Sequence, residues 1–303
     1  MRTSALLRDR LARIAKPSIV GVGDDVLDCY LNEDLAYPGG NALNVSVYSR
    51  LLFDGIAGFV GIVGDDRFAQ HLLAVLDEVG VDHTRVRRAA GANGMAFVAL
   101  DDDGDRRFVG SNRGGVQEGL RLRLTETDLD YLSGFGRVHT SVYSAIELEL
   151  PLLRARGIHV SFDFSDDPPA SILERVAPHV EVGFFSGGAL SDAEVERLGR
   201  RAVDAGIDTA VVTLGIRGSA AFSNGARSDA GVVPVEGIDA LGAGDAFIAG
   251  FLAATAAGSD LDECLEIAAV SGALACTYRG AFGYPVEAGA DARAQLIRRY
   301  EAV

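Results

Sequence analysis

Short hydrophobic runs alternate along the chain with longer segments in which hydrophobic and polar residues recur at helical spacing. The short runs are rich in β-branched residues and are typical of strands buried on both faces of a parallel sheet. They lie at residues 18–23, 57–63, 138–142, 159–164, 182–185 and 209–214. The alternation predicts an α/β fold with a doubly wound, mostly parallel central sheet flanked by helices, in which ligands bind at the carboxyl ends of the strands.

Local signals mark where several helices begin and end. Residues 67–79 carry hydrophobic side chains at helical spacing, and Gly80 follows them as a stop signal. Ser191-x-x-Glu194 is a capping box that opens a helix, which Gly206 ends, and Thr125-x-x-Asp128 is a weaker version of the same signal. These helices fill gaps between the predicted strands.

Two segments interrupt this alternation. Residues 26–37 and 95–109 have the pattern of antiparallel strands, and the second reads MAFVAL, the turn DDDGD, then RRFV. Extra strands cannot all join the central sheet without disturbing its order, so we expect a small antiparallel β sheet that covers one end of the domain as a lid. An ordinary surface hairpin is the alternative. Residues 1–17 are polar and rich in arginine, which predicts a short helix or arm ahead of the first strand.

The composition suits a protein with a large hydrophobic core and a small-molecule ligand. Hydrophobic residues make up 48% of the 303 residues, and the hydrophobic runs are well short of the roughly 20 residues of a membrane span. The net charge of −15 argues against nucleic acid and anionic membranes as partners. Cys29, Cys264 and Cys276 are odd in number and widely spaced, which favours reduced thiols in a cytoplasmic protein.

Lysine is almost absent, and this excludes several enzyme classes. Lys16 is the only lysine in the chain. There is therefore no GxxxxGK[ST] phosphate-binding loop and no lysine of the protein-kinase type. A Schiff-base or pyridoxal-phosphate enzyme would have to use Lys16, which precedes the first strand.

The stretch DALGAGDAFIAGF places glycines and a carboxylate where a helix begins. Gly242 and Gly244 allow a turn that directs successive backbone N–H groups at one point, and the dipole of the following helix attracts negative charge. A phosphate loop gains nothing from a carboxylate, so Asp245 indicates a base that deprotonates a nucleophile aimed at a bound phosphoryl group. The stretch therefore predicts phosphoryl transfer. A glycine turn with a helix-start aspartate is the alternative.

Two further stretches place polar groups at strand ends. VTLGIRGS is a strand that ends in Thr213, whose hydroxyl can donate to phosphate, and Gly215 and Gly218 would let the backbone pass close to a nucleotide. GDDVLD places Asp24 and Asp28 where a strand enters the predicted lid, and carboxylates there can accept bonds from neighbouring hydroxyls. An ordinary glycine turn and a solvated loop are the respective alternatives.

The segment PGGNALN predicts a helix with a polar start. Gly39 and Gly40 make a tight turn into the helix, and Asn41 and Asn44 lie three residues apart, so they share one face of its first turn. Two amides on that face suit sugar hydroxyls. Helix capping explains one of these asparagines but less naturally both.

Taken in this order over nearly the whole chain, these motifs resemble those of the PfkB (ribokinase-like) family of carbohydrate kinases. The GGNALN…GDD block is similar to the first signature of the family, and DALGAGDAFIAGF is similar to the second. The resemblance implies that residues 18–303 form a ribokinase-like kinase domain. It also implies phosphorylation of a primary hydroxyl on a small-molecule sugar, with ATP and Mg²⁺ as cofactors, and a homodimer that pairs through the lid.

The resemblance also assigns roles to individual residues. Asp245 is the catalytic base, and Gly242, Ala243 and Gly244 form the anion hole beside it. The nucleotide lies by Thr213, Gly215 and Gly218. The residues assigned to the sugar are Asp24, Asp28, Gly39, Gly40, Asn41 and Asn44. Asp239 lies near a loop that binds a monovalent cation, K⁺, in several relatives, and the Mg²⁺ ligands stay unassigned.

Within the family the resemblance is most detailed to the branch that phosphorylates fructoselysine, a sugar joined to the lysine side chain. GDDVLD-x-Y, GGNALNVSVY, HVSFDFSDD and GAGDAFIAGFL carry it. An acidic lid would suit the cationic tail of such a substrate. The acidic residues expected there are Glu33, Asp34, Asp101, Asp102 and Asp103.

The chain departs from the family pattern at three points. Ala240 stands where threonine is usual, the N-x-x-E that helps organise Mg²⁺ is replaced by SGGA at residues 186–189, and FDFSDDPP lacks the asparagine and arginine of many ribokinases. These departures argue against ribose and against the usual arrangement of Mg²⁺ ligands. Within the kinase class, adenosine, ribose, fructose and 2-keto-3-deoxygluconate are the rival substrates. A non-catalytic regulator that binds sugar or nucleotide on the same fold is the alternative from another class. The retained GAGD favours the enzyme.

Overall fold

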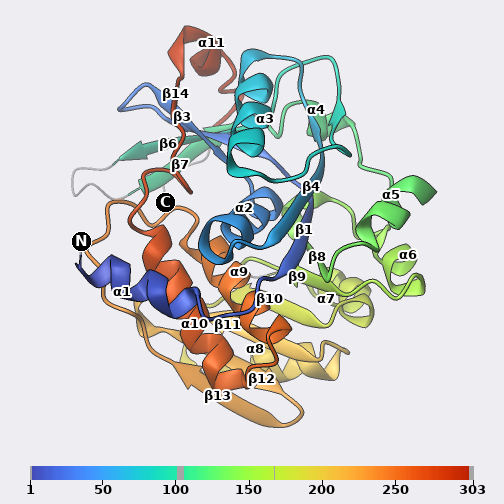
Figure 1. Cartoon of the computed structure of the whole chain (residues 1–303). Helices are drawn as coiled ribbons and strands as arrows, with labels where there is room; N and C mark the ends of the chain where they lie inside the picture. Colours follow the sequence, from blue (N-terminus) through green and yellow to red (C-terminus); the bar gives the residue numbers. More distant parts are fainter. Residues whose placement is uncertain (1, 101–105, 167, 300–303) are drawn as a thin grey trace.

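A nine-stranded sheet runs through the centre of the part of the protein that is described, residues 2–100, 106–166 and 168–299 of a computed structural model (Figure 1). In spatial order its strands are β13 (Ala226–Ala230), β12 (Ser219–Ser223), β11 (Thr209–Thr213), β10 (Val182–Ser186), β9 (Val160–Asp163), β8 (Arg137–Ser141), β1 (Ser18–Gly23), β4 (Ile56–Val63) and β5 (Arg87–Arg88). The neighbouring pairs from β11 to β5 are parallel, and β12 and β13 add antiparallel strands at one edge. The predicted mostly parallel sheet is confirmed.

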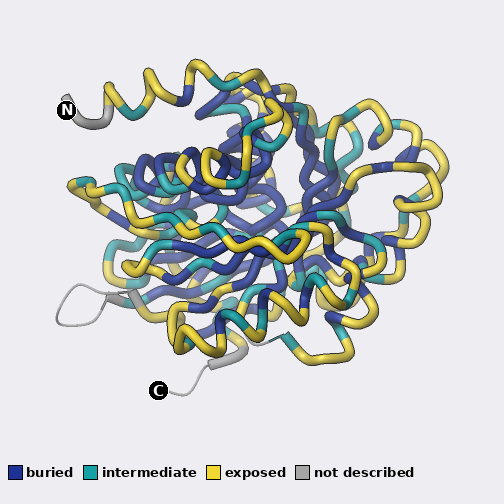
Figure 2. Tube along the Cα trace, turned by 90° about the horizontal axis from the view of Figure 1, so that it is seen from below, coloured by how far each residue is buried: buried dark blue, intermediate teal, exposed yellow. Residues whose placement is uncertain are grey.

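Helices cover both faces of this sheet, and each face has its own hydrophobic core. Strand side chains alternate between the faces, so that Ile19 of β1 packs into one core while Val20 and Val22 pack into the other. The helices of the first core are α2 (Asn41–Phe53), α3 (Arg67–Val79), α9 (Ala243–Ala256) and α10 (Leu261–Ala275), and those of the second are α5 (Glu126–Leu132), α6 (Leu150–Ala155), α7 (Ala170–Val176) and α8 (Asp192–Asp204). Figure 2 shows buried segments through the middle of the molecule and exposed ones outside.

The helix boundaries follow the capping signals of the sequence. Asp66 caps α3 by accepting a hydrogen bond from the Ala69 N–H at 2.8 Å, and Gly80 ends the helix in the left-handed conformation with φ 81°. The capping boxes of Ser191-x-x-Glu194 and Thr125-x-x-Asp128 are both formed, at the starts of α8 and α5. These three predictions are confirmed.

The direction in which strands are added reverses at β1, which pairs with β4 on one side and with β8 on the other. In an open α/β sheet such a reversal creates a crevice at the carboxyl ends of the strands. Asp24 follows β1, and Ser141 and Asp163 are the last residues of β8 and β9. The fold therefore brings these polar residues to the edge of the sheet where a ligand is expected.

A second sheet of six strands forms the predicted lid. In spatial order its described strands are β14 (Val286–Glu287), β3 (Leu35–Gly39), β2 (Val26–Tyr30), β6 (Met95–Leu100), β7 (Arg106–Ser111) and β15 (Arg298–Arg299). The pairs are antiparallel except β2 with β6, which is parallel. A separate sheet rather than a surface hairpin is confirmed, although the sequence did not predict its edge strands β14 and β15, which come from the end of the chain (Figure 1).

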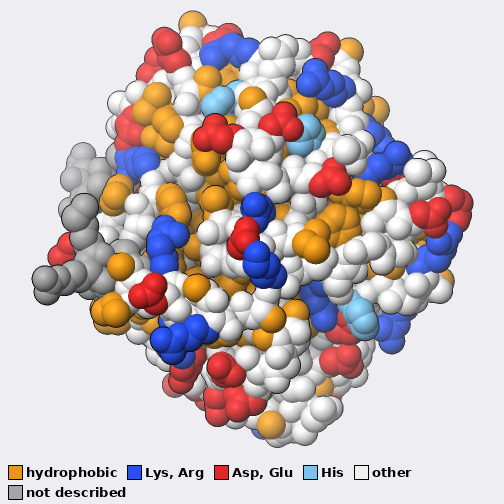
Figure 3. All heavy atoms as spheres, viewed as in Figure 1, with side chains coloured by type: hydrophobic (Ala, Val, Ile, Leu, Met, Phe, Trp, Pro, Cys, Tyr) orange, Lys and Arg blue, Asp and Glu red, His pale blue; other side chains and the backbone are white. Residues whose placement is uncertain are grey.

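The remaining short elements lie at the start of the chain and next to the lid strands in sequence. Residues Arg2–Leu11 form helix α1, whose Leu11 is fully buried and whose Arg10 pairs with Glu266 of α10. Helices α4 (Val116–Gly119) and α11 (Gly289–Ala294) follow β7 and β14. Within the described ranges, no helix combines the length and the hydrophobicity needed to cross a bilayer. On the face that Figure 3 shows, acidic and basic side chains are intermingled.

Candidate active site

The glycines ahead of Asp245 form the start of helix α9. Gly242 is its N-cap residue, with φ 75°, a left-handed conformation that favours glycine. A Cβ atom on Gly242 would also lie 2.8 Å from the Tyr48 hydroxyl oxygen and 2.9 Å from Ala281 Cβ. The Ala243 N–H, assigned to the anion hole, donates to the Ala240 carbonyl oxygen at 3.2 Å, so an anion bound here would have to share that donor. The predicted turn into a helix is confirmed.

Asp245 lies in the first turn of α9 and is held by the two asparagines of the first turn of α2. Asn41 Nδ2 donates to Asp245 Oδ1 at 2.8 Å, and Asn44 Nδ2 donates to Oδ2 at 2.6 Å. The two amides share one helical face, as the sequence predicts, and their common partner is this carboxylate. Asn44 Oδ1 is buried and has no hydrogen-bond partner among the described residues, so it is available to a ligand hydroxyl.

Carboxylates dominate the electrostatics around Asp245. Burial raises the pKa of Asp245 to about 8, with a further upward contribution from Asp163 and Asp24, while the hydrogen bonds from the two asparagines lower it. Burial likewise raises the pKa of Asp163 to about 6. Asn41 Nδ2 donates to Asp163 Oδ2 at 2.8 Å as well, so one amide bridges the two carboxylates. A carboxyl that titrates near neutral pH is suited to accepting a proton in catalysis.

A buried histidine fixes the orientation of the Asn41 amide. His139 Nε2 lies 3.0 Å from Asn41 Oδ1, and His139 Nδ1 lies 3.0 Å from Ser161 Oγ. Burial lowers the pKa of His139 to about 3, so the ring is neutral. Because Asn41 Oδ1 can only accept, Nε2 carries the proton and Nδ1 accepts from the serine. Sequence reasoning missed both residues, since each lies inside a predicted strand with nothing local to single it out.

The structure gives Asp24 a role in the chain itself. Its Oδ2 accepts from the Asn41 N–H at 2.6 Å, and its Oδ1 accepts from the Ala42 N–H at 3.3 Å and from the hydroxyls of Ser141 and Ser144 at 3.0 and 2.8 Å. The side chain therefore caps helix α2, whose N-cap residue Gly40 offers no side chain. This differs from the sequence expectation that Asp24 accepts sugar hydroxyls, because its carboxylate already has four protein donors.

The other residues assigned to the sugar lie where the lid meets α2. Asp28 is buried on β2, and a Cβ atom on Gly39 would lie 2.2 Å from Asp28 Oδ2. The carboxylate thus lies directly against the backbone of Gly39, which leaves room for no side chain there. Gly40 has φ 112° and is the N-cap residue of α2. The structure therefore brings Asp28, Gly39 and Gly40 to the start of the same helix that carries Asn41 and Asn44.

One cavity of about 510 Å³ joins the two glycine motifs. It is lined by Thr213 at the end of strand β11, by Gly215 and Gly218 after the strand, and by Ala243 and Gly244 of helix α9. Its volume is in the range of small-molecule sites. The residues predicted to bind a nucleotide and those predicted to hold the transferring phosphoryl group thus belong to one continuous space.

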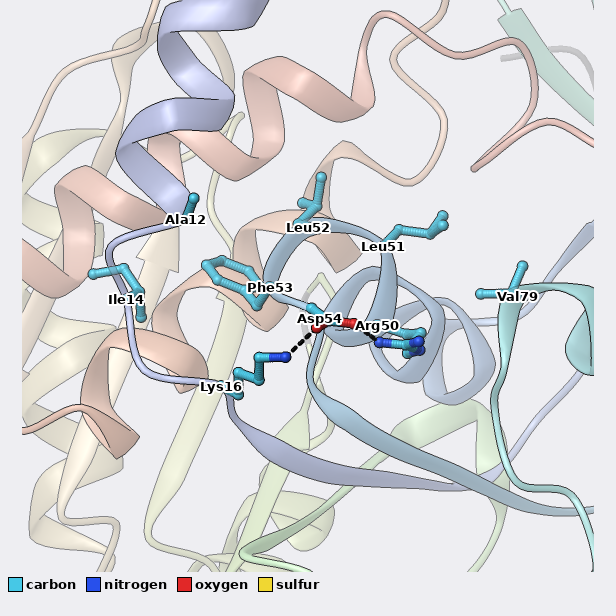
Figure 4. A pocket seen from close by; sticks show the side chains of 9 residues that line it. All are labelled: Ala12, Ile14, Lys16, Arg50, Leu51, Leu52, Phe53, Asp54 and Val79. Atoms are coloured by element: carbon cyan, nitrogen blue, oxygen red, sulfur yellow. Dashed lines mark hydrogen bonds and ion pairs between the residues drawn. The ribbon is translucent and has the colours of Figure 1, made fainter.

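A second cavity lies at the carboxyl end of α2 (Figure 4), with a volume of about 410 Å³. There Lys16 and Arg50 both bind the carboxylate of Asp54, the residue that ends the helix. The side chains drawn in Figure 4 include none of the predicted catalytic or ligand residues. We therefore assign the chemistry to the first cavity.

The expected acidic lid is partly neutralised by arginines from distant parts of the chain. Glu33 pairs with Arg279, and Asp34 pairs with Arg293 at 3.0 Å. The expectation that these two residues receive a cationic tail is therefore corrected, because each already has a cation beside it. Asp101, Asp102 and Asp103 lie outside the described residues.

The sequence and fold together place the protein in a known class. The chain belongs to the pfkB family of carbohydrate kinases, whose model matches residues 24–287. It is therefore a phosphotransferase that acts on a sugar hydroxyl, and the family predicted from the motifs is confirmed.

Individual relatives are similar over most of their length. The chain is 44% identical to fructosamine kinase FrlD of Bacillus subtilis, and the matching region covers 88% of this chain and 93% of that relative. It is 34% identical to fructoselysine 6-kinase of Escherichia coli, over 88% of this chain and 99% of that relative. Among solved structures, ribokinase of Arabidopsis thaliana complexed with ribose and ATP matches with a TM-score of 0.73 at 22% identity, over 88% and 95% of the two chains. The ribokinase-like fold is thereby confirmed.

Proposed function

We propose that this kinase transfers the terminal phosphoryl group of ATP to a primary hydroxyl of a sugar-amine, and that fructoselysine is its substrate. The observation that carries the proposal is the cavity that Thr213 and Gly215 line together with Gly244, the residue that precedes Asp245 in α9. The names of the two relatives support the sugar-amine. ATP is the nucleotide expected for the family, and the size of the cavity suits it.

Asp245 is the base of the proposed reaction. Asn41 and Asn44 hold its two oxygens, which fixes the carboxylate while it accepts the proton of the sugar hydroxyl. The N–H groups at the start of α9, with the helix dipole, stabilise the charge on the phosphoryl group as it is transferred. The unpartnered Asn44 Oδ1 would accept a hydrogen bond from a second sugar hydroxyl.

The charge of the site favours a cationic substrate over a neutral sugar. Asp24 and Asp163 both raise the pKa of Asp245, and Asp24 also raises that of Asp163. An ammonium group bound near Asp245 and Asp163 would be attracted to both carboxylates and would lower the pKa of each. A fructosamine carries such an amine next to its sugar ring, whereas fructose and ribose do not. The substrate itself would therefore help to ionise the base.

The cations implied by the family differ in their support. Mg²⁺ would neutralise the phosphates of ATP, and such ions are bound mainly through phosphates and water with few protein ligands. The described residues contain no group of three or more histidine, cysteine or acidic side chains that could hold a metal, and the Mg²⁺ ligands stay unassigned. At Asp239, the candidate K⁺ site, the carboxylate already accepts hydrogen bonds from the Tyr30 hydroxyl and the Gly280 N–H, which argues against K⁺.

Three further features belong to the proposal. Residues 18–303 would act as one kinase domain, with residues 1–17 as an arm that packs on it through Leu11. Two molecules would pair through their lid sheets. The protein would act in the cytoplasm, where the thiols of Cys29, Cys264 and Cys276 stay reduced.

Release of ADP tests the proposal. The protein is incubated with Mg·ATP and, in turn, fructoselysine, other fructosamines, fructose, ribose, adenosine and 2-keto-3-deoxygluconate. We expect kcat/KM for fructoselysine to exceed that for fructose by at least about tenfold. A preference for a neutral sugar would refute the assigned substrate and leave the kinase. Turnover of none of these compounds, with ATP still bound, would likewise refute fructoselysine as the substrate.

A further inference from the structure

The carboxylate of Asp239 is buried and surrounded by hydrogen-bond donors. Its side chain is 0% exposed, and its Oδ2 accepts from the Tyr30 hydroxyl at 2.6 Å and from the Gly280 N–H at 3.1 Å. Its Oδ1 accepts from the Leu241 N–H at 3.0 Å. A buried carboxylate needs such bonds and a nearby positive charge, because removing it from water is costly.

The chain itself supplies that positive charge. Arg279 Nη1 lies 3.9 Å from Asp239 Oδ2, and the guanidinium carbon lies 5.0 Å from the centre of the Tyr30 ring. The same guanidinium pairs with Glu33 on the turn between β2 and β3 of the lid. Arg279 therefore connects a lid strand, the loop before α9 and the loop after α10.

The residues around Asp239 do not fit a monovalent cation. Such an ion is bound by oxygen atoms that face it and replace its water. Here both Asp239 oxygens accept hydrogen bonds, and the Cys276 carbonyl oxygen accepts from the N–H groups of Ile238 and Asp239 at 2.7 and 3.2 Å. A second cation would also be repelled by the guanidinium of Arg279.

This cluster is close to the catalytic turn. Asp239 precedes Gly242 by three residues, and its hydrogen bond to the Leu241 N–H fixes the segment between them. The position of the α9 N-terminus, and of the N–H groups that stabilise the phosphoryl group, therefore depends on how the Asp239 carboxylate is held. A positive charge beside the Asp239 carboxylate therefore affects turnover indirectly, through the position of these N–H groups.

We propose that the Arg279 guanidinium replaces a monovalent cation at Asp239, so that phosphoryl transfer by this protein does not depend on K⁺. Arg279 is then a positioning residue for the anion hole at the start of α9. This inference rests on the proposed phosphoryl transfer but not on the identity of the sugar.

The test compares turnover in KCl, NaCl and choline chloride at equal ionic strength. The wild-type rate should change by less than about twofold among these salts, whereas Arg279→Ala should lose about tenfold in kcat in choline and regain a large part of it in KCl. Arg279→Lys, which keeps the charge, should stay near the wild type. Arg293→Ala is the matched control, because Arg293 also binds the lid turn, through Asp34 and the Leu31 carbonyl oxygen. It should stay insensitive to the cation.

Melting temperature gives a second reading that needs no turnover. KCl should stabilise Arg279→Ala relative to choline chloride and leave the wild type unchanged, even if the assigned sugar is wrong. The inference is overturned if K⁺ activates the wild type by about fivefold or more, or if Arg279→Ala keeps its kcat in choline. It is also overturned if Arg279→Ala and Arg279→Lys lose the same activity in every salt, because the charge would then not be the cause.

Discussion

Two glycines of the same motif should respond in opposite ways to alanine. At Gly242 an alanine must adopt φ 75°, which costs about 1 to 2 kcal/mol, and its Cβ would overlap Tyr48 and Ala281. Overpacking of that kind adds about 1 to 3 kcal/mol. Gly242→Ala should therefore lower the free energy of unfolding by about 2 to 5 kcal/mol and the melting temperature by roughly 3 to 8 °C.

Gly244→Ala is the matched substitution two residues later. Gly244 lies within helix α9, and a Cβ atom there meets no atom within 4 Å. Alanine in a helix should raise the free energy of unfolding by about 0.5 to 1 kcal/mol. Because Gly244 lines the cavity, the added methyl group would intrude on the phosphates, and kcat/KM for ATP should fall by about tenfold.

Thermal unfolding of both variants and steady-state kinetics of Gly244→Ala separate the two roles. The reasoning would be refuted if Gly242→Ala melted at the wild-type temperature, since neither the turn nor the contacts would then need glycine. It would equally be refuted if Gly244→Ala were fully active, because the cavity would then not hold the phosphates.

Two further predictions concern the carboxylate and its supports. Because the pKa of Asp245 is raised to about 8 in the free protein and a base must be ionised, kcat/KM for the sugar should rise with pH up to about 8. Asn44→Ala removes a hydrogen bond that lowers this pKa, so the rise of kcat/KM should move to higher pH in that variant. A shift to lower pH would contradict the role of Asn44. His139→Ala frees the Asn41 amide and should lower kcat by about tenfold with KM for ATP unchanged, measured by initial rates. An increase in KM for ATP at constant kcat would place His139 at the nucleotide instead.

Much of the fold follows from local patterns. Strand β1, helix α3 and the capping boxes of α5 and α8 were predicted because hydrophobic runs, helical spacing and cap residues are short-range signals. The edge strands β14 and β15 were not predicted, because each has two residues and becomes a strand only by pairing with β3 or β7. The parallel pairing of β2 with β6 likewise depends on the path of the chain between them.

The candidate site likewise has features that local sequence predicts and contacts that it does not. Glycine turns and the asparagine pair are visible in sequence, and Asn41 and Asn44 do share a helical face near the catalytic aspartate. Their partner, Asp245, lies more than 200 residues away, and so does Arg279, which pairs with Glu33. Local sequence patterns do not predict contacts between such distant residues. From the sequence alone, Asp24 was therefore assigned to the sugar and Glu33 to the cationic tail of the substrate.

Replacement of Asp245 by asparagine tests the central claim most directly. Asp245→Asn keeps the size of the side chain but cannot accept the proton, so turnover should fall by about 100-fold or more. The affinity for ATP, measured by calorimetry on the same sample, should stay within a few-fold of the wild type, because the residues assigned to the nucleotide are untouched. Near-normal turnover by Asp245→Asn would contradict its assignment as the catalytic base.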